Sequence, residues 1–289
     1  MQYASAIVNG ILLGGLYALF AAGLSFMFGV MRLVNLAHGA LAVLSAYGAL
    51  ILVRAGFVSP LLALLVVVPA IAALGYVLQR FVLQRTLTES PLPSLLVTFG
   101  LSIIIENVLL LTMTANTQHL SLGGFEKSSF SLGGLQVGWL PLITLLVAIV
   151  ALGAMSLVMG RTQFGRLVRA VSDDAPTVSL MGANPKHIYA IAAAIAFGLV
   201  AIAGVANGLR AGFDPPSGNA MLIYAFEAVI IGGLGSLWGT LLGAMILGVV
   251  QDLAAAIVDP SMGDLAGHIV FLIFLIFLPN GLIQRKVRL

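Results

Sequence analysis

The sequence has little charge and no cysteine. Lys, Arg, Asp and Glu make up 8% of the 289 residues, against about a quarter in soluble globular proteins. Hydrophobic residues make up 61% of the chain, and its mean hydropathy is +1.13. These values exclude a soluble globular protein and indicate one that crosses a membrane many times. The absence of cysteine excludes disulfide bonds, thiolate metal sites and cysteine catalysis.

Long apolar runs recur along the chain, without the alternation of polar and apolar residues that a β-barrel needs. A hydrocarbon core about 30 Å thick takes roughly 20 helical residues to cross. The first thirty residues lack a basic start, so we interpret them as a retained span rather than a signal peptide. The fold class predicted is all-α: a polytopic transmembrane bundle of about 8–10 helices, nine preferred, in a single domain over 1–289. The predicted spans are 5–31, 39–54, 60–83, 92–114, 137–159, 187–210, 218–234, 239–258 and 266–283.

The basic residues predict an orientation. If the polar stretch 160–186 is cytoplasmic, ten basic residues fall inside and three outside, as the positive-inside rule requires. The N-terminus is then outside and the C-terminus inside. The sequence pI of about 9.4 could suggest nucleic-acid binding, but the basic residues flank apolar spans, so no nucleic-acid partner is expected. The inside set is Arg32, Arg80, Arg85, Arg161, Arg166, Arg169, Lys186, Arg285, Lys286 and Arg288; the outside set is Arg54, Lys127 and Arg210.

Glycines recur at intervals of four, which favours close helix packing in a membrane. The sets are Gly10 and Gly14; Gly204, Gly208 and Gly212; and Gly235, Gly239 and Gly243.

Two interruptions divide apolar runs into short pieces: MRLVNLAHGA at 31–40 and IGGLGSLWGT at 231–240. Unwound backbone at membrane depth is tolerated where it is packed in protein or lines a cavity, so such breaks indicate a substrate path. The alternative is that both are interfacial turns and that the histidine is a hydrogen-bonded structural residue. No metal site is expected, because no companion ligands stand at suitable spacing. The candidate path residues here are Asn35, His38, Gly39, Gly232, Gly233 and Gly235.

Two carboxylates lie inside predicted spans, Glu106 and Glu227. A carboxylate at this depth is costly, so it faces the bundle interior, pairs with another group or is protonated. We assign both to the substrate path together with Asn107, the neighbour of Glu106. A structural hydrogen bond to a neighbouring helix remains the alternative for each carboxylate.

The stretch GRLVRAVSDDAPTVSLMGANPK, 165–186, holds five of the 23 charged residues in 22 positions. It predicts a short helix over 173–181, with Asp173 as its N-cap, Asp174 and Pro176 in its first turn and Gly182 at its end. Val178, Leu180 and Met181 form a small apolar face suited to a partner's groove. Upstream, Arg166 and Arg169 share one helical face. The alternative is an amphipathic helix resting on lipid headgroups.

With these motifs in view, the chain resembles the permease subunits of branched-chain amino acid ABC importers, the binding-protein-dependent components of the bacterial inner membrane. The residues that carry the resemblance are NGILLGGLYALFAAGLSFMFGVMRLVNLAHGALAVLSAYGA, GRLVRAVSDDAPTVSLMGANPKHIYAIAAAIAFGLVAIAGVANG, AFEAVIIGGLGSLWGTLLGAMILGVVQD and FLPNGL. They cover nearly the full chain.

The resemblance implies a second homologous permease, forming a heterodimer, two cytoplasmic ATPases and an extracytoplasmic solute-binding protein. This chain would bind no cofactor and would not be an enzyme, because ATP–Mg would be held by the ATPases. Residues of about 161–186 look like the coupling segment that seats in an ATPase groove.

The substrate and the mode of transport have alternatives. Glu227 stands where the family leads us to expect a small or apolar residue, and related permeases carry urea, amides, or aromatic and dicarboxylic acids. A standalone secondary transporter or channel, with Glu106 and Glu227 as proton-coupled groups, is the rival class.

Overall fold

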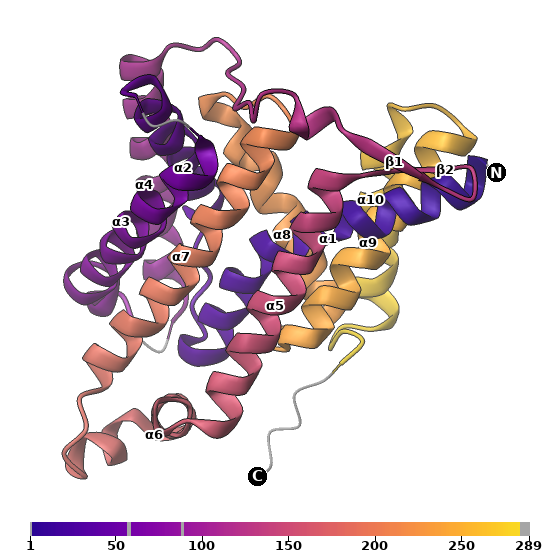
Figure 1. Ribbon diagram of the computed structural model, residues 1–289. Helices are drawn as coiled ribbons and strands as arrows, with labels where there is room; N and C mark the ends of the chain where they lie inside the picture. Colours follow the sequence, from indigo (N-terminus) through magenta and orange to yellow (C-terminus); the bar gives the residue numbers. More distant parts are fainter. Residues whose placement is uncertain (1, 57–58, 88–89, 284–289) are drawn as a thin grey trace.

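The computed structural model describes residues 2–56, 59–87 and 90–283, and this part of the chain folds into ten α-helices and one short hairpin (Figure 1). The all-α fold is confirmed. Arg285, Lys286 and Arg288, assigned above to the inside, lie outside the described residues. The α-helices are α1 (Gln2–Met31), α2 (His38–Arg54), α3 (Pro60–Phe81), α4 (Leu92–Met113), α5 (Trp139–Arg161), α6 (Gln163–Leu180), α7 (Pro185–Arg210), α8 (Gly218–Gly232), α9 (Leu237–Ile257) and α10 (Met262–Phe277); short 3₁₀ turns are η1 (Leu83–Arg85), η2 (Phe125–Lys127) and η3 (Pro215–Ser217).

Each predicted span coincides with a helix, but the spans are of two kinds. Six helices in the described ranges are long and apolar enough to cross a membrane: α1, α3, α4, α5, α7 and α9. The helices α2, α8 and α10 have 17, 15 and 16 residues, which gives lengths of about 22–26 Å at 1.5 Å per residue. They are too short to cross a 30 Å core alone.

Local sequence explains where several helices begin. Ser59, Asn184 and Ser236 each accept a hydrogen bond from a backbone N–H of the first turn of α3, α7 and α9. Such caps satisfy N–H groups that have no partner inside the helix. Pro60 and Pro185 then occupy the first helical position, where a missing N–H costs nothing.

The core of the molecule lies around α1 and α7. In their most apolar stretches, 89% of α1 and 67% of α7 is buried, against 22% for α3 and α4 and 28% for α5. The helices α3, α4 and α5 therefore lie at the periphery, where their apolar side chains can face lipid or a partner. In Figure 1, α2, α3 and α4 form one group and α9 and α10 another, with α1, α7 and α8 between them.

Glycines bring the central helices into close contact, as their spacing predicted. A Cβ atom at Gly10 or Gly14 would lie 2.5 Å from a Cα atom of α9, and one at Gly204 would lie 2.0 Å from the carbonyl oxygen of Ala42 in α2. Two members of the predicted sets stand elsewhere, because Gly212 follows the end of α7 and Gly235 lies in the turn before α9. For the remaining glycines of the predicted sets, the interval of four does place them on one face of a helix.

The connection between α5 and the preceding span contains an antiparallel hairpin that the sequence analysis missed. Strand β1 (Ser129–Leu132) pairs with β2 (Leu135–Gly138). Gly133 and Gly134 both have positive φ, 58° and 89°, as a two-residue hairpin turn requires. The hairpin lies at the end of the bundle opposite α6 (Figure 1).

Candidate functional site

The coupling segment α6 consists of two helices joined at Asp174. It starts at Gln163, where Thr162 accepts a hydrogen bond from the N–H of Gly165, and runs to Leu180. The helix is kinked at Asp174, whose φ and ψ are −151° and 87°. The second helix, after Asp174, therefore agrees with the short helix predicted over 173–181, except that it begins one residue later.

The cap assigned to Asp173 belongs to Asp174. The Asp174 carboxylate accepts hydrogen bonds from the N–H and the hydroxyl of Thr177, at 3.0 and 2.5 Å. These bonds hold the pKa of Asp174 below its usual range. Pro176 then lies in the first turn after the kink, where its missing N–H needs no partner. Asp173 is exposed.

The tip of the segment exposes two large apolar side chains. Leu180 is 89% exposed and Met181 is 81% exposed, whereas Val178 is 8% exposed and packs into the core. Val178 is therefore not part of the apolar face predicted for it. Gly182 ends the segment, as predicted, with a φ of 88° in the left-handed region.

The segment is attached to three of the long helices. The hydroxyl of Ser172 donates to the carbonyl oxygen of Gly29 in α1 at 3.1 Å, and Tyr189 of α7 donates to the carbonyl of Val171 at 3.3 Å. Arg169 donates to the carbonyl of Met159 in α5. The apolar face of Gly165, Val168 and Val171 is buried. Force applied at the tip would therefore reach α1, α5 and α7.

The two arginines of α6 differ in their surroundings. Arg166 is exposed, whereas Arg169 is half-buried and lines a cavity of about 330 Å³ between the ends of α1, α5 and α9. Gly235, from the second break, lines the same cavity. Arg169 is held by its bond to α5 of this chain. Arg166 is exposed, so it is the arginine of α6 that can contact a partner protein.

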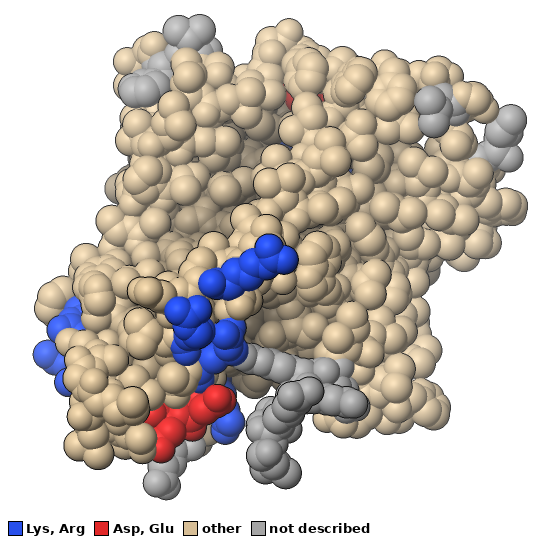
Figure 2. All heavy atoms as spheres, turned by 60° about the horizontal axis from the view of Figure 1, so that its bottom comes forward, with Lys and Arg blue, Asp and Glu red and all other residues tan. Residues whose placement is uncertain are grey.

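Basic residues gather around α6. Figure 2 shows lysines and arginines on this end of the molecule with acidic side chains beside them. Among the described residues, seven of the ten basic residues assigned to the inside stand near this end, at the ends of α1, α3 and α5, in η1, along α6 and at the start of α7. The end with α6 therefore carries the positive side chains that favour the cytoplasm.

The first break is unwound backbone inside the protein. Residues 32–37 leave the end of α1, and α2 starts at His38, whose Nε2 donates to the carbonyl oxygen of Phe20 at 2.9 Å. Phe20 lies about 16 Å back along α1 from its end, at 1.5 Å per residue. Asn35 and His38 are buried, and Gly39 packs directly against Gly218. The break is therefore not an interfacial turn.

The second break is a tight turn at the end that carries α6. Gly233 and Gly235 have positive φ, 107° and 79°, and Gly232 packs on Gly239 across the turn. A Cβ atom at Gly235 would lie 3.1 Å from Gly29 at the end of α1. Gly235 of the second break therefore lies at the end of α1, close to where the first break begins.

Glu106 and Asn107 lie on α4, at the edge of the bundle. Asn219 of α8 donates to Glu106 at 3.5 Å, and Asn107 is exposed with its amide bonded to the carbonyl of Ile103 in its own helix. An exposed side-chain amide that faces lipid carries a free-energy cost. This edge is therefore expected to face protein or water.

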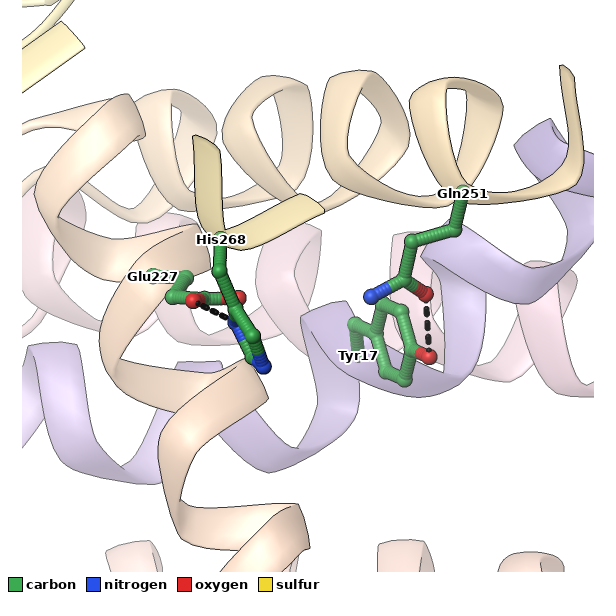
Figure 3. Close-up of polar contacts among 4 residues, drawn as sticks. All are labelled: Tyr17, Glu227, Gln251 and His268. Atoms are coloured by element: carbon green, nitrogen blue, oxygen red, sulfur yellow. Dashed lines mark hydrogen bonds and ion pairs between the residues drawn. The ribbon is translucent and has the colours of Figure 1, made fainter. Parts of the chain in front are cut away.

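Glu227 is buried between helices, and its partner is a residue that the sequence analysis missed. Glu227 is 3% exposed, and its Oε1 lies 2.5 Å from Nδ1 of His268 in α10 (Figure 3). Close by, the hydroxyl of Tyr17 in α1 donates to Oε1 of Gln251 in α9 at 2.6 Å. The sequence offered one signal for this group: His268 lies in a strongly apolar run, where a histidine is unusual.

The predicted site residues thus occupy five places: the α6 segment, the α2 start, the turn between α8 and α9, the α4 edge and the Glu227 pair. The structure brings Glu227 together with His268 but places neither beside His38 or Glu106 within hydrogen-bond distance. Among the described residues, no group of three or more His, Asp or Glu side chains is placed to hold a metal ion.

Comparison with known proteins assigns the chain to a family. Residues 6–278 match the family described as the permease component of the branched-chain amino acid transport system. Among curated proteins, the chain is 28% identical to the high-affinity branched-chain amino acid transport system permease protein BraD of Pseudomonas aeruginosa, over 98% of this chain and 96% of that one. It is 25% identical to LivH of Escherichia coli, with the same description, over 99% and 96%.

A more distant similarity covers half of the chain. The autoinducer 2 import system permease protein LsrC of Yersinia pestis is 26% identical over 49% of this chain and 40% of its own length. No solved structure matches. The family match spans nearly every helix described above, so the chain belongs to the family of branched-chain amino acid transport system permease components.

Proposed function

We propose that this chain is the membrane-spanning subunit of an ATP-driven ABC importer, which takes branched-chain or related small amino acids from a solute-binding protein. The family and the names of the relatives support transport of this substrate class. The observation that carries the ATP-driven part is the protruding corner formed by the end of α6.

Leu180 and Met181 are almost fully exposed at the end of the molecule where basic and acidic side chains gather (Figure 2). Large apolar side chains in such a place are typical of a docking surface. The corner is also bonded to α1, α5 and α7, so it can convert movement of a docked partner into movement of these helices. A carrier that works alone has no need of such a corner.

The proposed complex contains a second, homologous permease, two cytoplasmic ATPases that hold ATP–Mg, and an extracytoplasmic binding protein. The end with α6 faces the cytoplasm, and the N-terminus lies outside. Approach of the ATPases moves the α6 corners as rigid bodies and alternates the access of the substrate path. The unwound segment at Asn35 and His38 and the edge with Glu106 are the parts assigned to that path.

The test replaces both tip residues with glutamate, Leu180→Glu with Met181→Glu. We expect membrane insertion to be kept, because neither side chain is buried. ATP-driven uptake by the reconstituted complex is expected to fall by at least about tenfold, because charged residues at the core of a docking site are unfavourable. Uptake and ATPase activity are measured together in proteoliposomes.

The matched control keeps the apolar surface: Leu180→Met with Met181→Leu. Its uptake is expected to stay near that of the unchanged protein. Full uptake by the glutamate variant would contradict the docking role. Uptake by this chain alone, driven by an imposed ion gradient without ATPases, would favour the standalone transporter.

A further inference from the structure

A polar cluster lies among α1, α8, α9 and α10. Its members come from four helices, and Figure 3 shows two of its hydrogen-bonded pairs. Tyr17 and Tyr224 stack with ring centroids 4.9 Å apart, and Tyr224 and His268 stack at 6.4 Å. Asp264, one turn before His268, interacts electrostatically with both Tyr224 and Glu227.

Two buried atoms in this cluster have no hydrogen-bond partner within the described ranges. They are Oε2 of Glu227 and Nε2 of Gln251, in side chains whose residues are 3% and 4% exposed. A buried polar atom left without a partner costs about 1–3 kcal/mol. An acceptor and a donor left open in one cluster indicate that something else completes it.

The charges of the cluster favour a cation. It contains two carboxylates, Glu227 and Asp264, and two stacked tyrosines, whose ring faces attract cations. In the part of the chain that the structure describes, the one ion pair found is that of Glu227 with His268. Arg210 acts electrostatically on Tyr17 but makes no ion pair there. These residues also form no metal-binding group, so an organic ammonium suits them better than a metal ion.

The cluster is open on one side. The side chain of His268 is 42% exposed, although it lies on an apolar helix. An ionisable residue in a membrane faces protein or water rather than lipid. On α8, Asn219, Ile223 and Glu227 are spaced by four and share one side of the helix. Asn219 on that side bonds to Glu106, so the exposed edge described above continues to the cluster.

Resting on the proposed function, we infer that this cluster recognises the ammonium group of the permeating amino acid, with Glu227 as its acceptor. His268 holds Oε1 of Glu227, and Oε2, which has no partner among the described residues, is the acceptor that the ammonium group meets. The side chains of Tyr17 and Tyr224 form the wall against which the ammonium group lies.

The absence of cysteine in this chain allows a direct test. In membranes that contain the complete transporter, His268→Cys is reacted with a cationic thiosulfonate, the trimethylammonium reagent, and with an anionic one, the sulfonate reagent. Mass spectrometry follows the adduct on this chain. We expect the ratio of cationic to anionic rates to be at least about tenfold higher than for Leu272→Cys, one turn away, because carboxylates attract the cation.

Two controls identify the group responsible. Adding Glu227→Gln to His268→Cys is expected to lower the ratio at least about threefold, whereas adding Glu126→Gln, the same change at a carboxylate of η2 outside the cluster and the path, leaves it unchanged. L-leucinamide, which carries an ammonium group, slows the reaction, and N-acetyl-L-leucinamide, which does not, has no effect. A ratio insensitive to Glu227→Gln, or equal protection by both amides, overturns the proposal.

A second measurement uses the native histidine, in case the cysteine variant does not fold. L-leucinamide is expected to raise the unfolding temperature of the complex, N-acetyl-L-leucinamide to leave it unchanged, and Glu227→Gln to abolish the rise. Equal shifts with both amides would overturn the inference. Neither readout requires ATP-driven uptake, so failure here leaves the proposed function untouched, and loss of coupling at Leu180 and Met181 leaves the cluster untouched.

Discussion

Asp173 and Asp174 are adjacent and chemically identical, yet one of them alone organises the α6 corner. Asp174 bonds to the backbone and side chain of Thr177, and Asp173 is exposed with no such role. The sequence indicates a cap before Pro176 but not which acid supplies it, because both positions fit. Asp174 has non-helical φ and ψ, so it is the residue that precedes the second helix and can cap it.

The first prediction concerns the pH dependence of this cap. The pKa of Asp174 is lowered by its bonds to Thr177. A carboxyl group whose folded pKa lies below its unfolded value stabilises the folded state above the unfolded value, and this contribution is lost as the pH falls through the folded pKa. Exchange of the Thr177 amide hydrogen should therefore accelerate, relative to a helical amide elsewhere, only at pH values below the ordinary pKa of an aspartate.

Asp174→Asn is the matched variant, since asparagine can also cap a helix but does not titrate. In this variant, the protection of the Thr177 amide hydrogen against exchange should not show this dependence on pH. Asp174→Ala should lose the protection at every pH, while Asp173→Ala keeps it. Loss of protection in Asp173→Ala would restore the original assignment of the cap.

At the same scale, the sequence located single costly residues but not their partners. Glu106 and Glu227 stand out because carboxylates are rare inside apolar runs. Tyr17 and Gln251 do not, because neither side chain carries a charge and their bond joins positions 234 apart. Periodicity places a residue on a face of its own helix but does not say which helix covers that face.

At the scale of helices, the apolar runs predicted where each helix lies along the sequence, but they did not determine how deep in the protein each break lies. Boundaries agree within three residues, because prolines, glycines and capping residues limit the runs, except for the span 266–283, which the structure places at Met262–Phe277. The sequence favoured unwound backbone at depth for both breaks. The first agrees, because His38 bonds to the middle of α1, but the second is a tight turn at the end that carries α6. The β-hairpin was missed although Gly133–Gly134 between alternating residues is a hairpin signal.

The second prediction concerns helix packing. Gly204→Ala should destabilise the fold by about 1–3 kcal/mol, because overpacking at a tight contact costs this much; the added Cβ would lie 2.0 Å from the carbonyl oxygen of Ala42. Thermal unfolding in detergent measures the effect. Gly153→Ala in α5 is the control, since a Cβ there has no neighbour within 4 Å. Equal effects of the two changes would show that the α2–α7 contact tolerates a methyl group.

At the scale of the whole molecule, charge distribution sets the orientation. The described basic residues divide between the end with α6 and the opposite end, where Arg54, Lys127 and Arg210 lie. The sequence predicted this division from loop charges alone, because the rule depends on position along the chain and not on tertiary contacts. The assembly with other subunits has no such local signal.

The third prediction tests this orientation with single cysteines. Lys127→Cys and Ser179→Cys place a thiol at an exposed position at each end. A maleimide that does not cross membranes should label Lys127→Cys in intact spheroplasts and Ser179→Cys only after permeabilisation. The reverse pattern would place the α6 corner outside the cell, where it could not reach a cytoplasmic ATPase.

The stretch at 32–37 has a mechanical consequence. No helical hydrogen-bond ladder runs from α1 into α2, because six extended or turned residues separate them. Movement of α1 along its own axis, transmitted through the hydrogen bond between Ser172 and Gly29, is therefore taken up by a change in the conformation of residues 32–37. The imidazole of His38 connects α2 to α1 through its bond to the carbonyl oxygen of Phe20 and its contact with Gly23, whereas Gly39 holds α2 against Gly218 of α8, so α1 can shift while α2 stays in place.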